Sequence, residues 1–69
     1  MIIKVKFLPK GKDFKETKLK KGARGLDLLD KLNLAPDAHI ISRKGEPIPL
    51  DDELIDGDSI SIIKVVSGG

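Results

Sequence analysis

The sequence predicts an α+β fold, a mixed sheet of four or five strands with one helix packed across one face. Apolar and polar residues alternate at both ends of the chain, over residues 1–8 and 59–66, as they do in half-buried strands. Between them, residues 25–34 repeat leucine at helical spacing. A chain of 69 residues has room for one domain, which we expect over residues 1–66, with a flexible diglycine tail at 67–69.

The two opening strands should form a hairpin. The inward face of the first strand carries three apolar side chains that we expect in the core: Ile3, Val5 and Phe7. Residues 9–12 contain proline and glycine and should form the turn. The second strand then covers about residues 13–20. Phe14 has the wrong parity for its inner face, so it lies outside unless a bulge resets the register.

The remaining elements follow from proline positions and hydrophobicity. Pro36 should end the helix, because the residue before a proline avoids the helical region. Residues 39–43 predict a third strand, whereas residues 46–50 are rich in proline and suit the edge of a sheet. The closing strand, residues 59–66, is apolar enough for the middle of the sheet, so we expect it beside the first strand.

Charge is divided along the chain although its net value is only +2. Residues 1–24 contain nine basic and two acidic residues, and residues 25–69 contain four basic and nine acidic ones. Two interpretations stay open: solvated faces, or a basic hairpin and an acidic rim that steer partners of opposite charge.

Composition bears on the growth temperature of the source and on the cellular location of the protein. Cysteine and glutamine are absent, Asn33 is the only side-chain amide and lysine is abundant, which resembles the bias of thermophile proteins. There is no signal-peptide pattern and no apolar stretch of about 18 residues, so we expect a cytoplasmic protein without a membrane partner.

The sequence ends in Gly68 and Gly69, directly after the last predicted strand. A segment without Cβ atoms can enter a narrow enzyme cleft. A terminal carboxylate, with a pKa of about 3.3–3.7, is ionised at neutral pH and can attack a nucleotide phosphate. From Val65, the segment to Gly69 reaches at most about 17 Å. The alternative is a frayed terminus without function.

An enzyme that takes up the terminal glycines needs a surface by which to hold the domain. Ile60 and Ile62 share a parity and should be buried, which turns the alternate residues away from the helix. Ile40 and Ile41 must point to opposite faces, and parity does not say which one joins this surface. The predicted docking residues are Leu8, Ser61, Ile63 and Val65. Ordinary exposed aliphatic surface is the competing interpretation.

Several segments together resemble a known family. They are the opening hairpin, the leucine-rich helix, Lys44-Gly45-Glu46-Pro47-Ile48-Pro49, Asp56-Gly57-Asp58 and Ser67-Gly68-Gly69. Over its whole length the chain is similar to the ubiquitin-like β-grasp sulfur carriers of the ThiS and MoaD type. It is most similar to ThiS, archaeal small modifier proteins and Urm-type modifiers. It lacks the Phe-Ala-rich opening strand of molybdopterin-synthase small subunits, which counts against that branch.

The resemblance implies a substrate and carrier rather than an enzyme. In the family, an E1-like enzyme uses ATP to adenylate the terminal glycine, which is Gly69 here, with Gly68 as its slim neighbour. A persulfide then yields a thiocarboxylate that delivers sulfur for thiamine, tRNA thiolation or a related acceptor. Alternatively, a lysine of a target protein forms an isopeptide bond. Partners would be the activating enzyme and the sulfur donor and acceptor enzymes, with no bound cofactor.

A different class of function is a β-grasp RNA-binding module that uses the basic hairpin. Its affinity would fall steeply with salt. Phe7 and Phe14 are the only aromatic residues, so few side chains are available for base stacking, and we do not expect direct nucleic-acid binding. Asp52, Asp56 and Asp58 lack the spacing of a calcium loop, so no metal site is expected. We expect a monomer.

Overall fold

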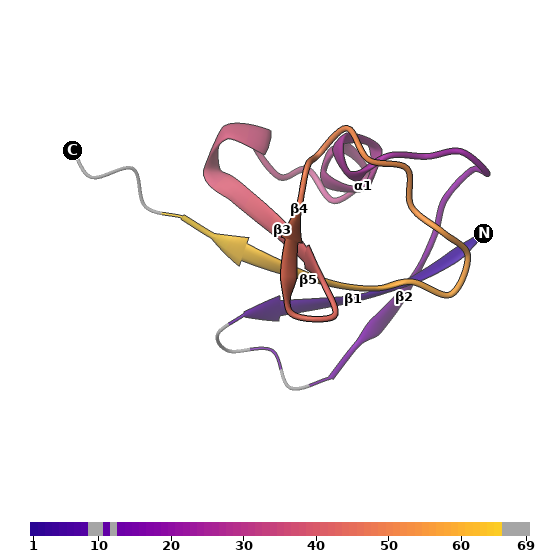
Figure 1. Ribbon diagram of the computed structural model, residues 1–69, viewed down its shortest axis with the longest axis horizontal. Coiled ribbons are helices and arrows are strands. Elements are labelled where there is room, and N and C mark those ends of the chain that lie inside the picture. The colour runs from indigo at the N-terminus through magenta and orange to yellow at the C-terminus, as the bar shows by residue number, and fades with distance from the viewer. Residues whose placement is uncertain (9–10, 12, 66–69) are drawn as a thin grey trace.

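Five strands form one mixed sheet with the order β2-β1-β5-β3-β4, and the helix α1 lies across one of its faces (Figure 1). The computed structural model describes the whole chain except residues 9, 10, 12 and 66–69. The elements are β1 (Ile2–Leu8), β2 (Lys15–Lys18), α1 (Gly25–Lys31), the 3-10 helix η1 (Pro36–Ala38), β3 (His39–Arg43), β4 (Glu46–Ile48) and β5 (Ser59–Lys64). The α+β prediction is therefore confirmed.

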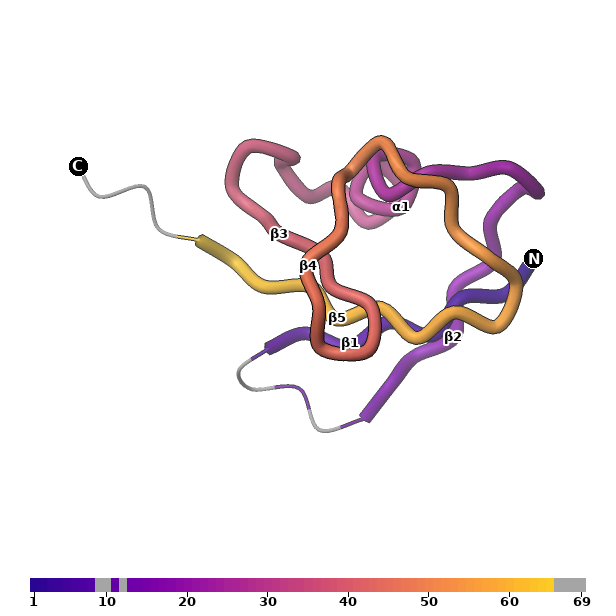
Figure 2. The backbone as a smooth tube through the Cα atoms, viewed as in Figure 1, coloured from indigo at the N-terminus to yellow at the C-terminus, as the bar shows by residue number. Residues whose placement is uncertain are grey.

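The first and last strands lie side by side in the middle of the sheet (Figure 2), as the hydrophobicity of the closing strand predicted. They run parallel, with Val5 opposite Ile60 and Leu8 opposite Ile63. The flanking pairs β1–β2, β5–β3 and β3–β4 are all antiparallel. The proline-rich segment pairs as β4 at the edge, so the sheet has five strands rather than four.

The core lies between α1 and the face of the sheet that it covers. Each of its apolar side chains contributes about 1.5–3 kcal/mol when it is removed from water. The buried cluster consists of Ile3, Val5, Leu28, Leu29, Ile41, Leu54, Ile60 and Ile62. Leu54 reaches this cluster from the long segment between β4 and β5, so that segment closes one side of the core.

The prediction that Phe7 is a core residue is wrong, because 43% of it is exposed. Its parity is the inward one that Ile3 and Val5 share. A helix of seven residues, however, is only about 10 Å long, whereas a strand of the same number extends about 23 Å. Phe7 lies opposite the buried Ile62 of β5, but the pairing of β1 with β2 ends at Val5, so Phe7 lies at the rim of the core. Phe14 lies outside, as its parity indicated, with 44% exposed.

The helix ends earlier than predicted and for a different reason. It stops at Lys31, and Asn33 adopts a left-handed conformation with φ of 58°. The Leu34 amide donates to the Leu29 carbonyl at 2.8 Å, and the Asn33 amide donates to the Asp30 carbonyl at 3.1 Å. This is a Schellman motif, which terminates the helix before Pro36 can. Pro36 instead begins η1.

The start of the helix is bound to the segment between β4 and β5. The amides of Gly25 and Leu26 donate to the carbonyls of Asp52 and Leu50 at 3.1 and 2.9 Å. These bonds satisfy helix-terminal amides that have no partner within the helix. At Gly25 a Cβ would lie 2.5 Å from the Ile41 Cδ1 atom and 3.0 Å from the Leu50 carbonyl oxygen. Glycine is required there by close packing.

Candidate docking surface

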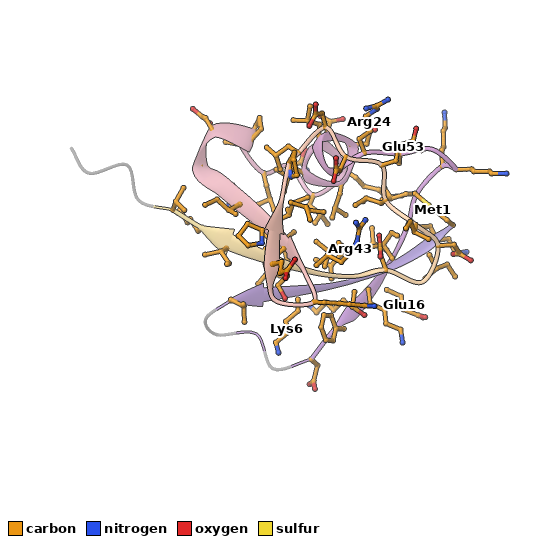
Figure 3. The ribbon with its side chains drawn as sticks, viewed as in Figure 1. Met1, Lys6, Glu16, Arg24, Arg43 and Glu53 are labelled. Carbon is orange, nitrogen blue, oxygen red and sulfur yellow. The ribbon has the colours of Figure 1, made fainter. Side chains whose placement is uncertain are left out.

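The face of the sheet opposite α1 carries three of the four predicted docking residues, Leu8, Ser61 and Ile63. In β5, Ile60 and Ile62 are buried beneath the helix, whereas Ser61 and Ile63 alternate with them and are half-buried. We call the side of the sheet that bears Ser61 and Ile63 the outer face. Lys6 and Glu16, from β1 and β2, also extend away from the helix on this side (Figure 3).

An apolar row crosses the outer face on three neighbouring strands. Ile63 lies opposite Leu8 of β1 on one side and opposite Ile40 of β3 on the other. Paired residues in adjacent strands point to the same face, so the three side chains are neighbours. Leu8 and Ile63 are half-buried, and Ile40 is 41% exposed. We call Leu8, Ile63 and Ile40 the apolar row.

Register decides the question that parity left open between Ile40 and Ile41. Ile41 pairs with Ile62 and is completely buried in the core. Ile40 therefore belongs to the outer face, where it extends the predicted docking surface by one residue. No sequence pattern identified it, because either of two adjacent isoleucines can face the core until the register with the neighbouring strand is known.

A polar row lies beside the apolar row. Lys6 lies opposite Ser61, which in turn lies opposite Ser42 of β3. The Lys6 ammonium lies 5.3 Å from the centre of the Phe14 ring, within the range of a cation–π interaction. Ser61 is half-buried but Ser42 is buried, so the candidate surface is an apolar strip with the Ser61 hydroxyl and a positive charge along one side.

Val65 follows β5 and is half-buried. Its amide donates to the Ala38 carbonyl at 2.9 Å, which holds this part of the chain next to η1. The last residue of β5, Lys64, lies opposite His39 at the start of β3. The predicted reactive residues Gly68 and Gly69 lie outside the described residues, as does the predicted tail 67–69.

An ion pair holds the turn that precedes β5. The Arg43 guanidinium donates from Nε to Asp58 Oδ1 at 3.1 Å and from Nη2 to Oδ2 at 2.8 Å. The same Oδ2 accepts the Ile55 amide at 2.8 Å. Only 11% of the Asp58 side chain and 24% of the Arg43 side chain are exposed, so water screens this bidentate pair weakly.

The environment of Asp58 shifts its ionisation. Burial of the carboxyl acts to raise its pKa, but hydrogen bonds from Arg43 and the Ile55 amide, with the charges of Arg43 and Lys44, outweigh burial. The pKa of Asp58 therefore lies below its ordinary value of 3.8. The charged carboxylate is the form that fixes the start of β5, and the geometry of β5 determines that of the outer face.

Two kinds of site are not found in the described part of the chain. Outside residues 9, 10, 12 and 66–69, no group of three or more His, Asp or Glu side chains is placed to hold a metal ion. In the same part, no helix has the length and hydropathy that crossing a bilayer requires.

Sequence comparison gives a family match over nearly the whole chain. The family described as small archaeal modifier protein 2 matches residues 1–66. An uncharacterized protein of Archaeoglobus fulgidus is 31% identical over 70 aligned positions, which cover all of both chains.

Solved structures give the same fold. SAMP1 from Haloferax volcanii is 20% identical over all of both chains, with a TM-score of 0.73. The ubiquitin of Caldiarchaeum subterraneum is 22% identical over all of this chain and 98% of that one, with a TM-score of 0.71. At these identities the comparison establishes the ubiquitin-like β-grasp fold.

Proposed function

Because the chain belongs to the small archaeal modifier protein 2 family, a group of ubiquitin-like proteins, we propose that its terminal carboxylate is activated by an E1-like enzyme. In this proposal the chain is a carrier, and the active site belongs to the partner. Gly69 is the reacting residue, and Gly68 lets the end of the chain enter a narrow cleft.

The chemistry follows from the low reactivity of a carboxylate. Its oxygen attacks the α-phosphorus of ATP, pyrophosphate leaves, and the resulting acyl adenylate has AMP as a good leaving group. The terminal sulfur of a persulfide then attacks the acyl carbon and AMP departs. A thiol reduces the acyl disulfide, which leaves a thiocarboxylate on Gly69. The chain has no cysteine, so every sulfur in these steps comes from a partner.

The outer face supplies the surface by which the partner would hold the domain. The apolar row and Val65 lie toward the end of β5, the end from which the chain continues to Gly68 and Gly69. A partner that covers this strip would receive the segment after Val65 in a fixed direction. Ser61 and Lys6, beside the strip, would give polar contacts at its rim.

The observation that supports activation most directly is the order of the parts: a family-matched domain over residues 1–66, followed closely by Gly68 and Gly69. Pyrophosphate exchange tests it. With an E1-like enzyme, labelled pyrophosphate should enter ATP only when this protein is present. A variant without Gly68 and Gly69 should give no exchange, and equal exchange from both proteins would exclude activation at Gly69.

The adenylate has two possible fates, and the modifier fate is favoured by the description of the family itself. In that case a lysine amine of a target protein replaces AMP and forms an isopeptide bond. The two fates share the exchange reaction but differ in their products. Digestion of cell protein should yield lysines linked to the carboxyl-terminal segment if conjugation occurs, and thiocarboxylate alone if it does not.

A further inference from the structure

A hollow separates the end of β2 from α1. Its walls come from the chain between the two elements and from the side of the helix. Four lysines and one carboxylate line it, together with small and apolar residues: Lys18, Leu19, Lys20, Lys21, Gly22, Ala23, Asp27 and Lys31. The Asp27 carboxylate already accepts a hydrogen bond from the Arg24 amide at 2.8 Å, so part of its negative charge is compensated at the start of the helix. We call this hollow the basic groove. Positive charge predominates there.

The strand beside the basic groove, β2, is an edge strand of the described sheet. Met1 and Leu19 exchange two backbone hydrogen bonds, at 2.7 and 2.9 Å. In an antiparallel ladder such pairs alternate with pairs that make no bonds to each other. Lys18 with Ile2, and Glu16 with Lys4, are therefore pairs that make no hydrogen bonds to each other. The backbone groups of Lys18 and Glu16 point out of the sheet, on the side where none of the described strands pairs with β2.

A lysine of the helix already occupies one of these edge positions. The Lys31 ammonium donates to the Lys18 carbonyl at 2.6 Å, across the basic groove from α1 to β2. A donor on the far wall therefore reaches a carbonyl that does not bond to β1. An incoming peptide amide can replace the lysine as donor, which frees the ammonium for a carboxylate.

We propose that the basic groove and the edge of β2 bind an extended acidic segment of a partner protein as an additional strand. The backbone of the segment pairs with Glu16 and Lys18. Its carboxylates contact the ammonium groups of Lys20, Lys21 and Lys31. The edge recognises any extended chain, and the lysines select an acidic one.

Other occupants fit these features less well. A nucleic acid could use the lysines, but it has no alternating amide and carbonyl groups for the edge, and Phe14 contacts Lys6 on the outer face instead. A second copy paired through its own β2 would bring lysines against lysines. The acidic segment 51–53 of a second copy is not available as a strand, because its backbone already bonds to α1 and Arg24.

The basic groove is distant from the proposed docking surface. Lys18 lies opposite Ile2, at the start of β1, whereas the apolar row contains Leu8, at its end. An acidic segment can therefore bind while an activating enzyme covers the outer face. The two proposals do not depend on each other, and either can fail alone.

The test uses the full chain and a short fluorescein-labelled peptide of alternating Glu and Val. Fluorescence anisotropy should give a Kd below about 1 mM, the weak end of specific binding. Two control peptides separate the contributions. Lys in place of Glu removes the charge complementarity, and Pro in place of Val removes amides that the edge requires. Both should bind at least about tenfold more weakly.

Matched variants locate the site. The double variant Lys20→Glu, Lys21→Glu should weaken binding by about tenfold or more. The double variant Lys44→Asp, Lys64→Glu makes the same change in net charge away from the basic groove and should change Kd less than about twofold, since salt screens distant charges. Equal losses in both variants would overturn the assignment.

Hydrogen exchange in the unmodified protein tests strand addition without any substitution. The amides of Glu16 and Lys18 should exchange more slowly when the acidic peptide is bound, because they gain backbone partners. Unchanged exchange at both amides would contradict strand addition, as would equal binding of the proline-containing peptide. A single-stranded oligouridylate that binds the groove more tightly than the acidic peptide would replace the protein partner with a nucleic acid.

Discussion

Truncating Ile40 on the outer face should weaken docking of the activating enzyme without unfolding the domain. Full burial of an isoleucine side chain is worth about 1.5–3 kcal/mol. The residue is 41% exposed in the free protein, so a partner that covers it gains roughly 1 kcal/mol from the remaining surface. Since 1.4 kcal/mol corresponds to a factor of ten, Ile40→Ala should raise the Kd about fivefold.

Ile55→Ala is the matched control for this substitution. Ile55 is 63% exposed and lies in the segment between β4 and β5, away from the apolar row, so its truncation should leave the Kd unchanged. Titration calorimetry with the E1-like enzyme measures both variants, and urea unfolding shows whether each remains folded. A fivefold change with Ile55→Ala, or none with Ile40→Ala, would refute the assignment of the outer face.

Three further predictions concern the domain itself. Asp58→Asn should lower the free energy of unfolding by about 2 kcal/mol at neutral pH, because Arg43 loses a charged partner that is largely shielded from water. The pKa of Asp58 is lowered in the folded state, so its contribution is complete above pH 3.8 and disappears as the pH falls through the folded pKa. Urea titrations should therefore show a shallower acid decline in the variant than in the unmodified protein, and parallel declines would contradict the shift. Asn33→Gly should preserve stability whereas Asn33→Ala should cost about 1 kcal/mol, because the position has φ of 58°; equal melting temperatures would disprove this explanation of the helix end. Gly25→Ala should cost about 1–3 kcal/mol by thermal unfolding, since its Cβ meets the Leu50 carbonyl, and a neutral result would show that the loop can move aside.

Strand order was predictable because strong alternation leaves few arrangements. Residues 59–64 place isoleucine at both parities, which is unusual for a strand with one solvated face. Such a strand is most stable between two others, and the structure places it between β1 and β3. The bounds of β3 were also predicted correctly as residues 39–43, since proline and glycine flank it.

The predictions for Phe7 and for the end of the helix were wrong because tertiary packing and backbone conformation, rather than the local sequence pattern, determine them. Alternation gave Phe7 the correct face but could not show how much of that face a seven-residue helix covers. Pro36 disfavours the helical conformation at the residue before it, yet Asn33 ended the helix earlier through bonds that depend on its left-handed conformation.

The candidate surface was only partly accessible from the sequence. Leu8, Ser61 and Ile63 follow from parity along β1 and β5. Ile40 required the register between β3 and β5, which a single strand does not encode. The basic groove combines residues from a strand end, a loop and a helix, so it becomes visible only when those elements are assembled.

Intact-mass measurement after complete activation tests carboxyl-terminal transfer most directly. The protein is incubated with ATP, an E1-like enzyme, a persulfide donor and a thiol, beside a carrier already known to react. We predict a mass increase equal to the replacement of one oxygen by sulfur, with the new sulfur located on Gly69 by fragmentation. An unchanged mass while the reference carrier reacts, or a mature protein that extends past Gly69, would contradict it.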